Sequence, residues 1–191
     1  MRSWSTCCCC WRVIGCAMGD GPMGAGAVGD GAAPFSAYRT MVRPEWLDYN
    51  GHMHDASYAI ALSEANEELF AVLDLSEEYR KATHASLYTI ECFIRFLAES
   101  SLGQTLTATT MLVGAERKLV RLFTELWRDD GQLAATGEFL YLHVDTLSGA
   151  TSEIPQPQLA GLRRMLSMHS TLARPDQLGR GVGAARDRVA G

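Results

Sequence analysis

Residues 46–54 read Trp-Leu-Asp-Tyr-Asn-Gly-His-Met-His and place three groups that handle protons or hydrogen bonds at every second position. These groups are the side chains of Asp48, Asn50 and His52, and Gly51 interrupts them. A carboxylate can take a proton from water or attack a carbonyl carbon, and an amide or imidazole can orient the reacting groups. The same residue types also favour turns for purely local reasons. By itself, the stretch is therefore either an acid–base site or an ordinary turn.

A helical pattern begins directly after this stretch. Apolar residues at 58, 62, 65, 69 and 72 follow helical spacing, which predicts a helix over residues 56–73. Asp55 is the predicted N-cap, and we expect His54 to be an ordinary surface residue. The free N–H groups at the start of such a helix, together with its dipole, can hold a developing oxyanion.

The remaining elements are predicted to be strands, with one last helix. We expect strands over residues 35–42, 86–97, 104–113, 118–128 and 132–145, and a C-terminal helix over 157–172. Within 86–97, alternation places Tyr88 and Cys92 on one face and Glu91 on the other. The expected fold class is α+β, with one long helix against one curved antiparallel sheet of about five strands, plus the C-terminal helix.

The two ends of the chain differ in composition from this body. Residues 1–34 are rich in Gly and contain Cys7, Cys8, Cys9, Cys10 and Cys16, and four consecutive cysteines have neither zinc-site nor disulfide-framework spacing. Val13-Ile14-Gly15-Cys16 is similar to a lipoprotein cleavage box, but Arg12 interrupts the apolar run that a signal peptide requires. We predict a disordered leader over 1–34, a domain over 35–172 and a disordered tail over 173–191.

Composition excludes several classes of protein. The formal net charge of −5 lacks the basic footprint of a nucleic-acid-binding protein. No apolar run approaches the roughly 18 residues of a membrane span. No cluster has metal-ligand spacing, and no Gly-x-Ser-x-Gly elbow marks a serine hydrolase. From these features we expect no nucleic-acid, membrane or metal partner. Cys92 is the only cysteine of the body, so we expect a reducing, cytoplasmic setting.

The order of elements and the motif together resemble the hotdog-fold acyl-CoA thioesterases of the 4-hydroxybenzoyl-CoA thioesterase type, over residues 36–146. The resemblance is strongest to the branch that hydrolyses betainyl-CoA in carnitine degradation. Four segments carry this likeness: 45–53, 87–91, 117–119 and 142–145. Where many relatives have two asparagines after the motif, this chain has His54 and Asp55.

The resemblance implies roles for the opening residues. Asp48 corresponds to the catalytic carboxylate, which acts as general base on water or as nucleophile. Asn50 orients the water or the thioester, and His52 shares in the chemistry or supports the loop. Gly51 lets the backbone approach the substrate, and the helix that starts near Asp55 holds the oxyanion.

Other residues are candidates for binding the substrate. Glu91 interrupts an apolar strand, so it is a solvated residue, the partner of a nearby arginine, an acyl-pocket carboxylate or a catalytic acid that reaches across a subunit interface. A betaine-like acyl group would favour aromatic faces, for which Tyr58 and Tyr88 are candidates alongside Tyr49 and Trp127. Arg117 and Lys118 either bind the phosphates of coenzyme A or form a charged turn that protects a strand edge.

The expected function is hydrolysis of a small acyl-CoA thioester, which requires no cofactor because coenzyme A belongs to the substrate. A non-catalytic acyl-CoA-binding protein and an enoyl-thioester hydratase of the same fold remain alternatives. One helix and one sheet leave apolar residues exposed on the strands, so we expect a homodimer or a homotetramer.

Overall fold

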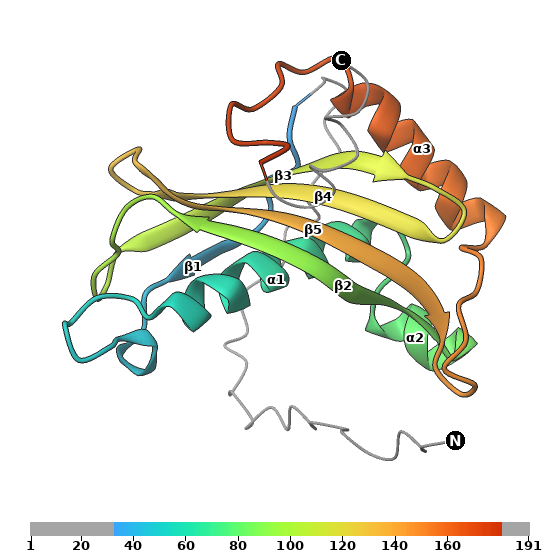
Figure 1. Cartoon of the computed structure of the whole chain (residues 1–191), viewed down its shortest axis with the longest axis horizontal. Helices are drawn as coiled ribbons and strands as arrows, with labels where there is room; N and C mark the ends of the chain where they lie inside the picture. The colour runs from blue at the N-terminus through green and yellow to red at the C-terminus, as the bar shows by residue number, and fades with distance from the viewer. Residues whose placement is uncertain (1–32, 181–191) are drawn as a thin grey trace.

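The computed structural model describes residues 33–180 as one sheet with three α-helices (Figure 1). The strands are β1 (Arg39–Met41), β2 (Ala85–Phe96), β3 (Thr105–Ala115), β4 (Leu119–Arg128) and β5 (Leu133–Asp145). The helices are α1 (Asp55–Val72), α2 (Glu77–Thr83) and α3 (Gln156–His169), with a 3-10 turn, η1 (Pro44–Trp46), before α1. The predicted leader up to residue 32 and the predicted tail beyond 180 lie outside the described residues.

The long helix α1 lies against the concave face of the curved sheet (Figure 1). All neighbouring strands are antiparallel, in the order β1-β3-β4-β5-β2. Leu62 and Leu69 of α1 are fully buried in one core with Leu122 of β4, because an apolar stripe on a helix and an apolar sheet face cover each other. The predicted fold class is therefore confirmed, and α1 covers the sheet face that lies next to the loop at residues 47–53.

A β-bulge in β2 changes the predicted faces of this strand. The pairing with β5 shifts between Thr89 and Glu91, so Ile90 is the extra residue. Cys92 pairs with Phe139 on the helix side, whereas Tyr88 and Glu91 pair with Leu142 and Leu140 on the outer face. The prediction that Tyr88 and Glu91 lie on opposite faces is therefore wrong, because one inserted residue reverses the alternation.

The two edges of the sheet differ in their cover. Beyond β1, helix α3 lies along β3, and His169 Nδ1 accepts a hydrogen bond from the Leu112 N–H at 2.8 Å. This contact satisfies a backbone donor that would otherwise face the free edge. The opposite edge, β2, exposes the large apolar side chains of Tyr88, Ile90 and Phe93. Among the described residues, nothing comparable to α3 lies along β2.

Two segments near the sheet were not predicted. Helix α2 is only seven residues long, too short for a periodic apolar pattern, and Tyr79 Oη lies 2.9 Å from His143 Nε2 of β5. Residues 173–180, which open the predicted tail, lie against the outer face of the sheet, where the Gly179 and Arg180 amides donate to Glu138 Oε1 at 3.0 Å. We therefore propose that the folded body extends to about residue 180.

Candidate functional site

The loop that carries the opening motif is fixed at both ends. Trp46 and Met53 are buried beside α1, and Leu47 forms an isolated β-bridge with Met53. The Met53 amide donates to the Ser100 carbonyl at 2.7 Å, which ties the loop to the β2–β3 connection. Tyr49, at the tip of the loop, is 97% exposed. The base of the loop is thus rigidly held, while its polar tip faces solvent.

Hydrogen bonds within this loop orient the Asp48 carboxylate. Its Oδ1 accepts from the backbone N–H of Asn50 at 2.8 Å and from the backbone N–H of His52 at 3.3 Å. Its Oδ2 accepts from the side-chain Nδ2 of Asn50 at 3.2 Å. Partial desolvation raises the pKa of Asp48, but the bonds from Asn50 and His52 outweigh it and hold this pKa below its usual value. Gly51 has φ +80°, a conformation that glycine adopts without strain. The turn therefore presents an ionised carboxylate in a defined orientation.

The start of α1 differs from the prediction. His54 is the N-cap, and Asp55 is the first residue of the helix. The Ala56 amide lies 3.1 Å from His54 Nδ1 and 2.7 Å from Asp55 Oδ1, and these two side-chain atoms lie 2.6 Å from each other. The prediction that Asp55 caps the helix is therefore wrong, whereas His54 lies on the surface as predicted and caps the helix as well. An imidazole nitrogen can replace the usual carboxylate or hydroxyl oxygen as the capping acceptor.

A cleft of about 290 Å³ opens beside the helix start. It is lined by residues of the loop, of α1, and of the end of β2 with the connection that follows it: Met53, Asp55, Tyr58, Phe96, Leu97, Ala98 and Glu99. The rings of Tyr58 and Phe96 pack edge to face at a centroid distance of 5.5 Å. Glu99 Oε2 lies 3.5 Å from His52 Nε2, so the cleft and the Asp48 loop are contiguous. Phe96 and Glu99 were not predicted as site residues, because no local motif marks them.

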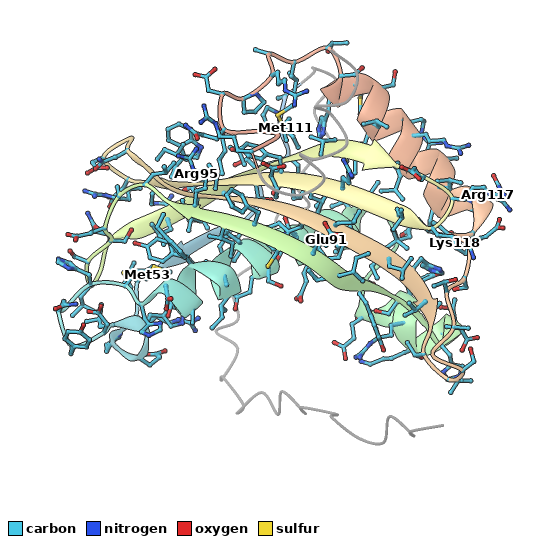
Figure 2. The ribbon with its side chains drawn as sticks, in the orientation of Figure 1. Met53, Glu91, Arg95, Met111, Arg117 and Lys118 are labelled. Atoms are coloured by element: carbon cyan, nitrogen blue, oxygen red, sulfur yellow. The ribbon has the colours of Figure 1, made fainter. Side chains whose placement is uncertain are left out.

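Within one copy of the chain, the other predicted site residues lie elsewhere. Figure 2 shows Glu91 near the middle of β2, and Arg117 and Lys118 at the end of the sheet opposite Met53. Arg117 forms an ion pair with Glu153, and Lys118 Nζ donates to Thr151 Oγ1 at 3.1 Å. The structure therefore brings Asp48, Asn50, Gly51, His52, Asp55 and Tyr58 together, and leaves Tyr88, Glu91, Arg117 and Lys118 apart from them.

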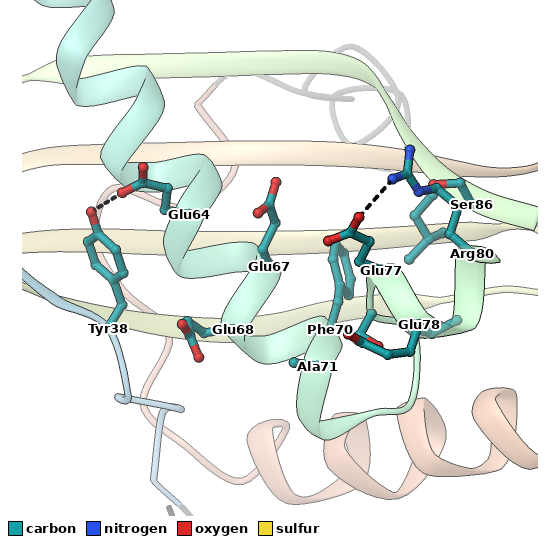
Figure 3. Close-up of a pocket in the computed structure, with 13 residues that line it drawn as sticks. Tyr38, Glu64, Glu67, Glu68, Phe70, Ala71, Glu77, Glu78, Arg80 and Ser86 are labelled. Atoms are coloured by element: carbon teal, nitrogen blue, oxygen red, sulfur yellow. Dashed lines mark hydrogen bonds and ion pairs between the residues drawn. The ribbon is translucent and has the colours of Figure 1, made fainter. Parts of the chain in front are cut away.

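A larger cleft of about 700 Å³ lies between α1, α2 and the beginning of β2 (Figure 3). Five carboxylates line it: Glu64, Glu67, Glu68, Glu77 and Glu78. Tyr38 Oη donates to Glu64 Oε2 at 2.6 Å. Burial, and then the charges of Glu64 and Glu68, raise the pKa of Glu67. This acidic cleft lies along the second half of α1, away from the helix start.

Among residues 33–180, no three His, Cys, Asp or Glu side chains group as metal ligands. Across the same range, no helix is long and apolar enough to cross a membrane.

The sequence is similar to enzymes of known activity. It is 38% identical over 153 residues to an L-carnitine dehydrogenase/betainyl-CoA thioesterase of Agrobacterium fabrum, covering 80% of this chain but 31% of that protein. It is 34% identical over 149 residues to a betainyl-CoA thioesterase of Pseudomonas aeruginosa, covering 78% of this chain and 94% of that protein. The chain thus spans about a third of the length of the two-function relatives it matches.

Solved structures show the same fold. A Staphylococcus aureus protein crystallised in complex with CoA superposes with a TM-score of 0.72 at 28% identity, covering 78% of this chain and 94% of that chain. A putative thioesterase of Pseudomonas putida superposes with a TM-score of 0.68 at 27% identity, covering 78% of this chain and 96% of that chain. The family model of the thioesterase-like superfamily matches residues 42–162, which include the Asp48 loop, the helix start and the whole β2–β5 sheet. With its helix wrapped by a curved five-stranded sheet in the hotdog arrangement, this chain belongs to the thioesterase-like superfamily.

Proposed function

We propose that this chain hydrolyses a small acyl-CoA thioester, with Asp48 as general base or nucleophile. The observation that carries the proposal is the Asp48 turn, which presents an oriented, ionised carboxylate beside the start of α1 and the cleft. Membership of the superfamily supports thioester chemistry at this place. The activity named for the Pseudomonas aeruginosa relative, which this chain matches over 94% of its length, supports the same reaction.

In the general-base route, Asp48 takes a proton from a water molecule as the water oxygen bonds to the thioester carbon. The carbonyl oxygen becomes an oxyanion, for which we propose the backbone N–H of Asp55, the first of α1, as donor, because the Ala56 and Ser57 N–H groups already have acceptors. The C–S bond then breaks, and the proton held by Asp48 passes to the sulfur of coenzyme A. In the nucleophilic route, an Asp48 oxygen displaces the thiolate, and water hydrolyses the resulting anhydride. The lowered pKa of Asp48 keeps it ionised at neutral pH, which both routes require.

The acyl group that we propose is small and cationic, like betaine. The relatives of Agrobacterium fabrum and Pseudomonas aeruginosa are both named for betainyl-CoA. A short acyl group also suits the cleft, whose volume of about 290 Å³ is at the small end of ligand pockets.

We further propose that two copies associate through β2. This edge exposes Tyr88, Ile90 and Phe93, which are 50%, 47% and 38% exposed. A long apolar edge strand with free backbone groups is a template for pairing with another strand. The covered edge at β3 gives no such opportunity, so a homodimer through β2 is the smallest assembly that buries the apolar edge. We propose the cytoplasm as the location, as expected from the single cysteine of the body.

A panel of acyl-CoA substrates tests the proposed reaction, with release of the free thiol as the readout. The panel contains betainyl-CoA, acetyl-CoA, a medium-chain acyl-CoA and a benzoyl-CoA. We expect turnover of betainyl-CoA, with at least tenfold lower kcat/KM for the others. No thiol release from any of them, by protein with a verified fold, would contradict the proposed function.

A further inference from the structure

We infer that the cleft at the start of α1 is a binding site for a quaternary ammonium group, with Glu99 as the counter-charge and Tyr58 and Phe96 as aromatic walls. The inference rests on the proposed function and adds to it the residues that select the acyl group. Neither Phe96 nor Glu99 was identified from sequence, and both come to the site only through the fold.

The chemistry of the substrate sets where the cation must bind. In a betaine-like thioester, one methylene separates the charged nitrogen from the carbonyl carbon. A group that recognises the nitrogen must therefore lie directly beside the group that attacks the carbonyl. Glu99 lies in this region, because its Oε2 is 3.5 Å from Nε2 of the His52 ring, and the backbone N–H of the same His52 donates to Asp48. Glu91, in the middle of β2 on the outer face, does not.

The aromatic walls are held in place by the core and the backbone. Tyr58 is 3% exposed, and its hydroxyl donates to the Ala98 carbonyl at 3.2 Å, so its ring is fixed at the floor of the cleft. Phe96 packs edge to face on this ring and is 53% exposed. Aromatic faces attract quaternary ammonium ions through the ring quadrupole, and the attraction increases when water is excluded. A neutral acyl group of the same shape is not attracted to the rings in this way.

Glu99 has a fixed backbone and an available side chain. Its carbonyl accepts from Arg128 Nη1 at 2.7 Å, and the next residue, Ser100, accepts from the Met53 amide. The side chain itself is 77% exposed. Exposed ion pairs contribute little to stability, so the His52–Glu99 pair is not needed to hold the fold. The carboxylate therefore stands at the mouth of the cleft, free to face a bound cation.

The acidic cleft between α1 and α2 is the competing location for a cation. Its carboxylates belong to the second half of α1, as Glu67 does, or to α2, whereas Asp48 precedes the first turn of α1. Three helical turns or more separate Glu67 from the helix start, at about 5.4 Å per turn. An acyl group that places its carbonyl at Asp48 cannot also place its nitrogen there within the same copy.

A pair of isosteric substrates tests the inference. Betainyl-CoA carries a trimethylammonium group, and 3,3-dimethylbutanoyl-CoA carries an uncharged tert-butyl group of the same shape. We expect the wild-type kcat/KM to favour betainyl-CoA by at least tenfold. In Glu99→Gln and in Phe96→Leu, the loss on betainyl-CoA should exceed the loss on the neutral isostere by about tenfold and about fivefold, respectively. Glu67→Gln is the matched control and should keep the wild-type ratio. Light scattering checks that every variant keeps the wild-type assembly.

Each other outcome overturns a defined part of this reasoning. Equal losses on both substrates in Glu99→Gln would show that Glu99 acts through His52 rather than on the acyl cation. A selective loss in Glu67→Gln would move the cation to the acidic cleft. A wild-type enzyme that hydrolyses both isosteres equally refutes the cation site and leaves the thioesterase intact. A wild-type protein that hydrolyses neither, nor any member of the wider panel, refutes the proposed function itself.

Discussion

The substitution Asp48→Asn separates the chemical role of this residue from its role in the turn. The wild-type carboxylate accepts two backbone amides on Oδ1 and Asn50 Nδ2 on Oδ2. An asparagine oxygen can still accept both amides, but its NH₂ group then faces the NH₂ group of Asn50. Only one solvent-exposed hydrogen bond is lost, so the free energy of unfolding should fall only slightly. The loss of a base or nucleophile should instead lower kcat by about a hundredfold or more, equivalent to about 2.7 kcal/mol of activation free energy.

Two measurements on the same preparation distinguish these effects. Urea unfolding gives the stability change, and thiol release from the best substrate gives kcat and KM. Glu45→Gln is a matched control, because Glu45 is an exposed carboxylate three residues before Asp48. Its only ion pair among the described residues joins its Oε1 to Arg43 Nε at 3.6 Å. We expect its kcat to stay within about twofold of the wild type, since exposed ion pairs contribute little. If Asp48→Asn retains near-wild-type kcat in a folded protein, Asp48 is a turn residue and the proposed mechanism is wrong.

Three further outcomes follow from the sheet and its edges. His169→Leu leaves the buried Leu112 amide without its acceptor and should lower the free energy of unfolding, measured in urea, by about 1–3 kcal/mol. His169→Asn keeps an acceptor near the position of Nδ1 and should recover part of this loss. Equal losses in both variants would mean that packing alone matters. Burial lowers the pKa of His143 and of His169, so both are preferentially neutral in the fold. Their contribution to stability should be complete above the unfolded pKa of about 6.5 and should fall as the pH is lowered through it, which unfolding at pH 7.5 and pH 5.5 measures. Finally, light scattering at micromolar concentration should show a dimer that Ile90→Lys converts to a monomer, and a monomeric wild type would exclude pairing through β2.

The local pattern of the sequence was sufficient for the main elements. The apolar spacing over 56–73 predicted α1, which runs Asp55–Val72, and the strand predictions differ from β2, β3, β4 and β5 by only one or two residues at most ends. Helical and strand periods are properties of neighbouring residues, so a single sequence contains them. The motif around Asp48 was visible for the same reason, because its hydrogen bonds join residues at most four positions apart.

Contacts between distant residues decided the rest. The bulge at Ile90 depends on the register between β2 and β5, which alternation within β2 cannot specify, and it placed Tyr88 on the outer face together with Glu91. His54 is the cap of α1, although its neighbour Asp55 has the stronger local preference for that position. Glu99 reaches His52 across 47 positions of sequence because the Met53 amide bonds to Ser100. The sequence by itself determined the long elements and the catalytic candidate Asp48. Only tertiary packing decided which side chains line the cleft beside it, because that depends on how β2 ends against the start of α1.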